Sequence, residues 1–170
     1  MAQDKFDLKP ILRELKRRSR KLPKILGVKA KNHFRRSFVD GGFTDNGLEK
    51  WLEVKRRQKS SKWYGKEVRE KDGKLGLYNS PAAKTRAILV GKGGGTLKRS
   101  VKVIKAGFNQ VVVGTKGVKY AAIHNEGLPG KVFGRTPFQM PKRQFVGNSR
   151  KLERELEKVV VRELDKVFKR

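Results

Sequence analysis

The chain has 170 residues and no cysteine, and its 44 Lys and Arg residues against 16 Asp and Glu residues give a formal net charge of +28. The absence of cysteine excludes disulfides and thiolate metal sites and favours a reducing compartment. An excess of positive charge of this size favours a polyanionic or strongly acidic partner.

No stretch approaches eighteen uninterrupted apolar residues, and the N-terminal "MAQDKFDLKP" lacks the apolar run of a signal peptide. We therefore expect a soluble, intracellular protein with no membrane partner. The length fits one domain, and we expect residues 1–170 to form it, with residues 40–80 as a projecting arm or long loop.

Two basic helices are predicted at the N-terminus. From Leu8 onward apolar residues recur at helical spacing, Pro23 is expected to break this helix, and a second helix runs to about Phe38, with Phe34 one turn before it. Residues 9–36 hold twelve basic residues and one acid. We expect this basic surface to face an acidic protein or DNA through Arg13, Arg17, Arg18, Arg20 and Lys21.

The arm at 40–80 shows neither a clear helical nor a strand period. Trp and Tyr residues interrupt it, at Trp51, Trp63, Tyr64 and Tyr78. Aromatic side chains in a polar arm often anchor against another surface, but they can equally pack onto their own domain, and the sequence leaves both interpretations open.

The second half of the chain is predicted to hold a small sheet. "AAKTRAIL" indicates a short helix, and "TLKRSVKVI" and "NQVVVGT" indicate two strands that a short turn joins as an antiparallel hairpin. "YAAIHNEG" is a compact apolar segment before the loop "LPGKVFGRTPFQMPKRQF", and the periodicity predicts a helix from about Asn148 to Phe168. The fold class is therefore α+β, a small antiparallel sheet flanked by helices.

The glycine-rich stretch "VGKGGGTLKRS" does not match a nucleotide site. A P-loop needs a lysine and a Ser or Thr directly after its last glycine, at the start of a helix, whereas here Lys92 precedes the main glycine run and a strand is expected next. The dinucleotide fingerprint is absent as well. We interpret the stretch as a flexible connection between the short helix and the first strand.

No motif for catalysis or for a metal stands out. His33 and His124 are the two histidines, and one imidazole near one carboxylate provides too few ligands for a metal site. The acids of the last helix, Glu163 with Lys166 for example, fit surface ion pairs. We expect no enzyme activity, no cofactor and no metal.

The ordered strings "RAILVGKGGGTLKRSVKV", "VVVGTKGVKYAAIHNEG" and "MPKRQFVG", followed by a terminal helix, resemble the phage virion morphogenesis family, the Mu-like tail completion proteins of the head-to-tail junction. "NHFRRSF" at 32–38 and Trp51 resemble its N-terminal portion, so that the resemblance covers about residues 28–168. The residues that carry it are Leu89, Gly95, Leu97, Ser100, Tyr120, Ala121, Ile123, His124, Gly127, Pro141, Arg143, Phe145 and Gly147.

The resemblance implies a non-catalytic structural protein that forms a ring, expected to have six copies, at the neck or tail end of the virion, after assembly in the host cytoplasm. Portal, adaptor or tail tube proteins would be its neighbours, with DNA in the lumen. The residues that we expect at subunit or partner interfaces are Tyr120, Ile123, His124, Phe138, Arg143, Phe145, Trp51 and Trp63, with Lys98 and Arg99 joining the basic, partner-facing set.

Two rival functions remain open. A nonspecific nucleic-acid-binding protein would use the positive charge, with Trp63 and Tyr64 as stacking groups. A cell-wall hydrolase of morphogenesis is a third hypothesis, and the lack of a plausible acid pair or metal site in the loops counts against it.

Overall fold

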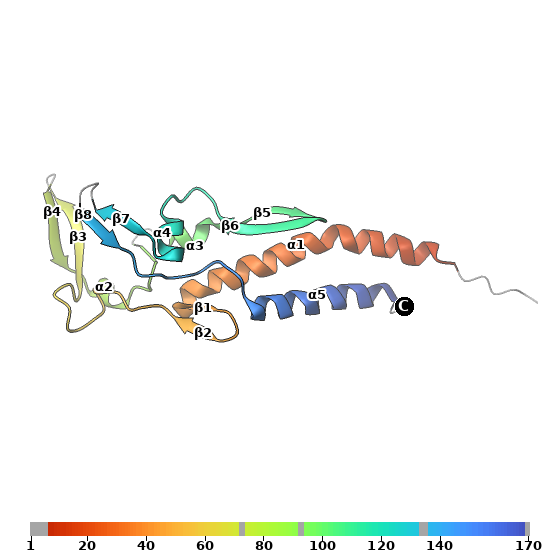
Figure 1. Cartoon of the computed structure of the whole chain (residues 1–170), viewed down its shortest axis with the longest axis horizontal. Helices are drawn as coiled ribbons and strands as arrows, with labels where there is room; N and C mark the ends of the chain where they lie inside the picture. The colour runs from red at the N-terminus through yellow and green to blue at the C-terminus, as the bar shows by residue number, and fades with distance from the viewer. Residues whose placement is uncertain (1–6, 72–73, 92–93, 133–135, 169–170) are drawn as a thin grey trace, which may run out of the picture.

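The computed structural model describes residues 7–71, 74–91, 94–132 and 136–168. Figure 1 shows an elongated molecule whose longest element is helix α1 (Lys9–Asp40). The antiparallel helix α5 (Arg150–Phe168) packs along one side of α1. The hairpin of β5 (Val101–Gly107) and β6 (Gln110–Thr115) packs along another side. The α+β class predicted from the sequence is confirmed.

Helix α1 is continuous, so the predicted break at Pro23 is wrong. Proline at this position removes one hydrogen bond, to the carbonyl of Ser19, yet the helix runs on to Asp40 and ends at Gly41, whose φ of +64° is left-handed. The helix persists because α5 and the β5–β6 hairpin pack against it on both sides of the proline, and this packing offsets the lost bond.

The hydrophobic core lies where the C-terminal half of α1 meets the rest of the chain. Phe34 and Phe38 are buried one turn apart on α1, as predicted, and the Phe38 ring contacts Trp51 and Phe145 with centroids 5.7 and 5.0 Å away. Gly27 of α1 lets the hairpin approach, since a Cβ there would lie 2.9 Å from a methyl group of Val103.

The β5–β6 hairpin is antiparallel, as predicted, with a bulge after Val103. The prediction that "TLKRSVKVI" is a strand throughout is wrong for its first part, which forms helix α3 (Thr96–Ser100). Burial explains the helix, because Leu97, Ser100 and Val101 are all buried at spacings of three and four. The glycine connection therefore joins two helices, α2 (Pro81–Thr85) and α3, with residues 92–93 outside the described part.

Residues 40–80 contain two hairpins, which the prediction of an arm or loop missed. Strands β1 (Gly42–Thr44) and β2 (Leu48–Lys50) form one, and β3 (Lys66–Lys71) and β4 (Lys74–Asn79) form the other. Strand β3 reads "KEVREK" and has almost no apolar alternation. A buried carboxylate supports it instead: Glu67 accepts a 2.9 Å hydrogen bond from the Tyr78 hydroxyl and forms an ion pair with Arg86.

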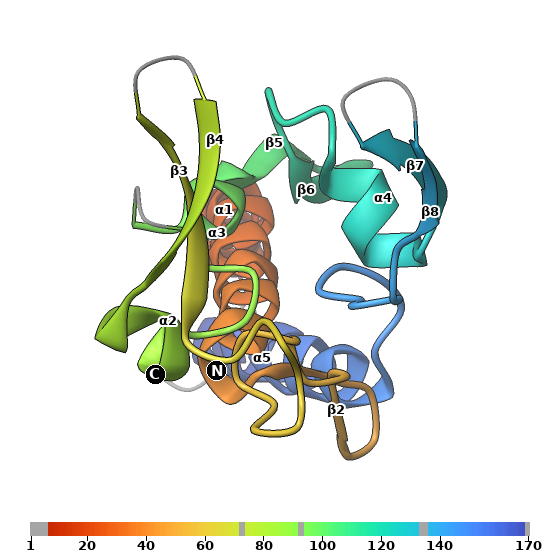
Figure 2. The same ribbon diagram turned by 90° about the vertical axis from the view of Figure 1, so that its left-hand side faces the viewer.

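The predicted loop after "YAAIHNEG" also holds a hairpin, β7 (Pro129–Val132) with β8 (Thr136–Gln139), and residues 133–135 between the strands lie outside the described part. The apolar segment itself forms helix α4 (Ala121–Glu126). Each sheet in the described residues has two strands. Figure 2 shows the β3–β4 and β7–β8 hairpins on opposite flanks of the molecule when it is viewed along α1.

Helix α5 begins within two residues of its predicted start. Its first turn is capped by the residue that precedes it and by a distant one: the Ser149 hydroxyl accepts from the Leu152 N–H at 3.1 Å, and the Asp45 carboxylate accepts from the Arg150 N–H at 2.7 Å. Ser149 also donates to the carbonyl of Thr44 at 2.8 Å. The turn between β1 and β2 is therefore fixed to the start of α5.

Candidate partner-binding surfaces

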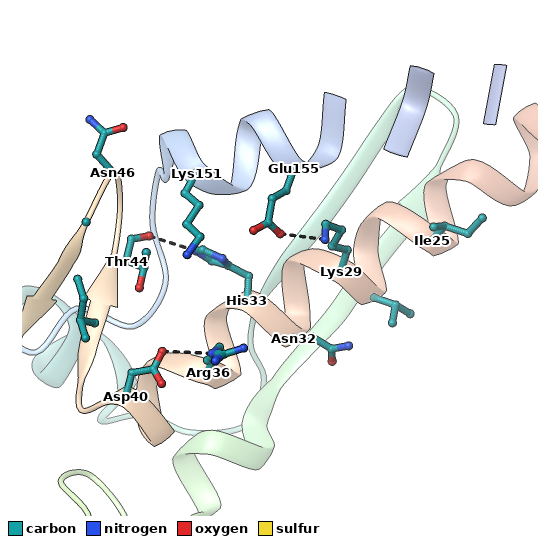
Figure 3. A pocket seen from close by; sticks show the side chains of 13 residues that line it. Ile25, Lys29, Asn32, His33, Arg36, Asp40, Thr44, Asn46, Lys151 and Glu155 are labelled. Atoms are coloured by element: carbon teal, nitrogen blue, oxygen red, sulfur yellow. Dashed lines mark hydrogen bonds and ion pairs between the residues drawn. The ribbon is translucent and has the colours of Figure 1, made fainter. Parts of the chain in front are cut away.

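A polar groove of about 790 Å³ lies between α1, the β1–β2 hairpin and the start of α5. Figure 3 shows two ion pairs in it: the Lys29 ammonium of α1 lies 2.8 Å from the Glu155 carboxylate of α5, and within α1 the Arg36 guanidinium lies 3.4 Å from Asp40. The His33 Nε2–H donates to the carbonyl of Thr44 at 3.2 Å. These contacts join three elements of the fold to one another.

The protonation states in this groove follow from the same contacts. The hydrogen bond with Lys29 lowers the pKa of Glu155, so this carboxylate stays charged. Burial lowers the pKa of His33 below 6.5, against the hydrogen bond with Thr44 and the charge of Glu155, so that the imidazole is neutral at pH 7. In the part of the chain that the structure describes, no three potential metal ligands cluster here or elsewhere.

Three of the predicted interface residues are core residues instead. Trp51, Arg143 and Phe145 are buried, Phe145 with 1% of its side chain exposed, and a partner cannot reach them in this conformation. Their contacts explain why: the Trp51 indole donates to the carbonyl of Gln144 at 2.7 Å, and the Arg143 guanidinium donates twice to the carbonyl of Leu52, at 3.2 and 3.0 Å. We call this set of contacts the 51–145 clip.

Helix α4 is attached to the same clip. The side-chain oxygen Oδ1 of Asn125 accepts from the backbone N–H groups of Phe145 and Val146 at 2.9 and 3.0 Å. The Arg143 N–H donates to the carbonyl of His124 at 2.8 Å, and burial and the Arg143 charge lower the pKa of His124. "AAIHNEG" and "PKRQF", which carry the family resemblance, thus hold the fold together.

The remaining predicted interface residues are at least partly exposed. Ile123 lies on α4 and Tyr120 directly precedes this helix, and the Tyr120 ring meets the half-buried His124 ring edge-on, with centroids 5.8 Å apart. Phe138, on β8, is half-buried against its own hairpin, where a Cβ on Gly130 would clash with its ring. Their roles in an interface stay predictions.

Trp63 lies apart from these residues and lines a shallow pocket of about 390 Å³ with Val54, Lys55, Arg56 and Lys66. The Lys62 ammonium lies 5.9 Å from the centre of the Trp63 ring, and the Lys84 ammonium lies 4.9 Å from the centre of the Tyr64 ring. A nucleic-acid base that stacked on the lysine-covered face of either ring would have to displace a lysine of the same chain.

The predicted basic residues divide into two groups. Arg13, Arg17, Arg18, Arg20 and Lys21 lie on the N-terminal half of α1, whereas Lys98 and Arg99 lie on α3, beside the C-terminal half, where the Arg99 carbonyl accepts from Arg35. Fifteen residues of helix separate positions 20 and 35, which corresponds to about 22 Å. The two basic stretches are therefore separate along α1, with Lys24, Lys29 and Lys31 between them.

Within the first group, two arginines are neutralised locally. Glu14 forms ion pairs of 2.6 Å with Arg17 and 2.7 Å with Arg18, and Arg18 also lies 2.9 Å from Glu163 of α5. The hydrogen bond with Arg17 lowers the pKa of Glu14 to about 2. Arg13, Arg20 and Lys21 are exposed and have no ion-pair partner among the described residues.

Sequence reasoning missed an apolar groove of about 640 Å³ between the N-terminal half of α1, the C-terminal end of α5 and the β5–β6 turn. The signal that could have found it is Phe108, an aromatic residue in a turn that usually holds polar residues or glycine. The other apolar residues of the lining are Leu12, Leu15, Leu22, Val160 and Leu164.

No helix in the described residues is long and apolar enough to cross a membrane. Comparison with curated proteins and with solved structures found no match to the chain. The family model of the phage virion morphogenesis family matches residues 78–165, which is more than half of the chain and includes α2 to α4 and most of α5. The predicted resemblance is thereby confirmed, and the chain belongs to the phage virion morphogenesis family.

Proposed function

We propose that this protein is a non-catalytic structural subunit that forms a ring of six copies at the neck or tail end of a phage virion. The ring completes the tail and supports its joining to the DNA-filled head, and it assembles in the host cytoplasm. Membership of the phage virion morphogenesis family supports the role in virion assembly. The ring and its position are the steps that the proposal adds.

The observation that supports a ring is the large solvent-accessible surface of the chain. The chain exposes 12582 Å². A compact monomer of the same 19.4 kDa mass exposes about 8,500 Å². The excess of roughly 4,000 Å² reflects an elongated shape, and it leaves enough surface for an interface on each of two sides of the subunit. Assembly is therefore the state for which this elongated shape is suited.

The exposed elements suggest where neighbouring subunits meet. A closed ring needs two different patches on each subunit. The β3–β4 and β7–β8 hairpins stand on opposite flanks of the chain, and both have two strands with open edges that another chain can contact (Figure 2). Tyr120 directly before α4 and Ile123 on α4, with Phe138 on β8, belong to the second flank.

Mass photometry and negative-stain microscopy of the purified protein test the ring. We expect closed particles of about 116 kDa, six times the mass of one chain. Tyr120→Asp with Phe138→Asp should shift the particles towards monomers, because two charges enter an apolar contact. Val161→Asp, at an exposed position of α5, is the matched control. A protein that stays monomeric at every concentration, or that stops at symmetric dimers, would contradict the ring.

The rival function, nonspecific nucleic-acid binding, receives less support. Its stacking groups, Trp63 and Tyr64, already have lysine ammonium groups near their faces. The positive charge that would attract nucleic acid would attract an acidic protein equally well. We therefore favour the structural subunit.

A further inference from the structure

The apolar groove beside Phe108 is an open continuation of the hydrophobic core. Towards the C-terminal half of α1, the space between α1, α5 and β5–β6 is filled by core side chains such as Phe34, Val101 and Leu152. Towards the N-terminal half, the hairpin ends at its turn while both helices continue (Figure 1). No described element covers the space beyond that turn, so the apolar seam opens to solvent there.

The lining of the groove is apolar and accessible. Phe108 at the hairpin turn is 82% exposed, Leu12 of α1 is 58% exposed, and Leu164 of α5 is 39% exposed. Three separate elements thus place large apolar side chains around one hollow of about 640 Å³. Clustered exposure of this kind marks a surface that another molecule covers.

The α1 side of the groove is positively charged, whereas the acid on the α5 side, Glu163, is neutralised by ion pairs with Arg18 and Lys166. Lys9, Arg13, Lys16 and Arg20 follow one another at spacings of four, three and four on α1, which places them in one row along the helix. Lys16 lines the groove, and Lys16 and Arg20 together line a smaller hollow on the other side of Phe108. None of the four has an ion-pair partner among residues 7–71, 74–91, 94–132 and 136–168.

We propose that this groove binds an amphipathic helix of a different virion protein, one with an apolar stripe flanked by Asp and Glu. The groove is bounded by the antiparallel helices α1 and α5, an arrangement against which a third helix can pack, and the row of cations on α1 complements acidic side chains beside the stripe. The inference rests on the proposed function only in taking the partner from the virion.

Other occupants fit the groove less well. A second copy of the chain brings the same net charge of +28, and its own long helices offer no acidic stripe, since residues 9–36 carry an excess of +11 and residues 150–168 hold six basic residues against five acids. A lipid bilayer is flat, whereas the apolar residues line a hollow. Nucleic acid would meet an apolar floor instead of cations.

Site-directed photo-cross-linking in the assembling phage tests the proposal. Position 108 receives the photoreactive amino acid p-benzoylphenylalanine, and position 39, where Val39 is exposed at the other end of α1, receives it as the control. We expect position 108 to cross-link to another virion protein, in a segment with apolar residues at spacings of three and four and with flanking Asp or Glu. Position 39 should give at most about a tenth of that yield.

Charge variants make the test specific. Lys16→Glu with Arg20→Glu should lower the yield from position 108 about tenfold at moderate salt, because the acidic flanks of the partner are then repelled. Lys116→Glu with Lys119→Glu changes the net charge equally at exposed positions outside the groove and should leave the yield unchanged.

A cross-link only to a second copy of the chain, to lipid or to DNA would overturn the proposal, and so would the absence of any product at position 108. If tails are still defective without the protein while position 108 gives no product, the groove inference fails and the proposed function stands. If tails form normally without the protein, the proposed function fails by itself.

Discussion

Arg143, a residue of the family motif, stabilises the fold. Its guanidinium is buried and donates two hydrogen bonds to the carbonyl of Leu52, so that it joins segments 91 positions apart in the sequence. Arg143→Ala should lower the free energy of unfolding by about 2–3 kcal/mol, because charged hydrogen bonds are lost and a carbonyl is left unsatisfied. Urea unfolding measures this. Arg13→Ala, an exposed control, should change the free energy of unfolding by less than about 0.5 kcal/mol. If the two substitutions destabilised the protein equally, the stabilising role of the 51–145 clip would be contradicted.

The two histidines give the protein a predicted pH dependence. Burial lowers the pKa of both His33 and His124 below the ordinary 6.5, so the unfolded chain binds more protons than the folded one when the pH falls below that value. The free energy of unfolding is therefore unaffected by the protonation of these histidines above pH 6.5. It decreases as the pH falls from 6.5 towards their pKa values in the folded protein. We expect urea unfolding to show lower stability at pH 5.5 than at pH 7.

Variants separate the histidines from the carboxylates. Glu14 and Glu155 have lowered pKa values and lose their stabilising effect only as the pH falls below the ordinary 4.5, which lies outside the window from 7 to 5.5. His33→Asn with His124→Asn should therefore flatten the dependence in that window. A slope that is unchanged in the double variant would show that the histidines are not its cause.

Helix α1 gives a prediction at the scale of elements. Pro23 interrupts its hydrogen bonding without breaking it, so Pro23→Ala should restore the donor to the Ser19 carbonyl and raise the free energy of unfolding by about 1–3 kcal/mol. Thermal or urea unfolding would record the gain. A loss of stability would instead mean that the contacts of the buried proline ring outweigh the missing hydrogen bond.

The β3–β4 hairpin depends on one buried carboxylate. Glu67→Gln removes the charge that Arg86 meets, and a buried ion pair that loses one partner destabilises its surroundings by about 3–5 kcal/mol. We expect faster amide hydrogen exchange in residues 66–71 and 74–79, with α1 and α5 unchanged. Glu49→Gln, at an exposed position of β2, is the control. Protection that is unchanged in the hairpin would contradict the role of Glu67.

Elements with a clear hydrophobic period could be predicted from the sequence. Helix α5 and the β5–β6 hairpin were predicted, because in each of them the apolar residues face one neighbouring element of the fold. Elements that depend on distant contacts could not: β3 relies on the ion pair of Glu67 with Arg86, and α1 passes Pro23 because two other elements hold it. Tertiary contacts decide such cases, and a local pattern does not contain them.

The candidate surfaces, too, could be predicted only where they do not depend on tertiary contacts. Motif residues such as Trp51 and Phe145 were predicted at an interface, but the large aromatic rings that characterise an interface characterise a core equally well. The apolar groove was not predicted, because it arises only where Phe108 is brought beside Leu12 and Leu164 from two helices. Residue types were therefore informative about the family and less so about which side chains remain exposed.

At the scale of the whole molecule, an elongated subunit carries a net charge of +28, and exposed cations such as Arg13, Arg20 and Lys21 lie along the N-terminal half of α1. We expect Arg13→Glu with Arg20→Glu and Lys21→Glu to reduce the yield of infectious phage by at least about tenfold when the gene is supplied in trans, because an acidic neighbour is repelled. Lys59→Glu with Lys102→Glu and Lys116→Glu, which changes the net charge equally at exposed positions outside the β3–β4 and β7–β8 hairpins, is the control. Equal titres for the two triple variants would show that the titre depends on net charge alone, and would contradict a specific role for the cations of α1.

The central claim, a structural role in completing the tail, is tested most directly by negative-stain electron microscopy of lysates in which a stop codon interrupts this gene in the parent phage. The account predicts filled heads beside unattached or overlong tails, and normal particles when the gene is supplied in trans. Normal, infectious tailed particles without the protein would contradict the account and would make nucleic-acid binding the leading hypothesis.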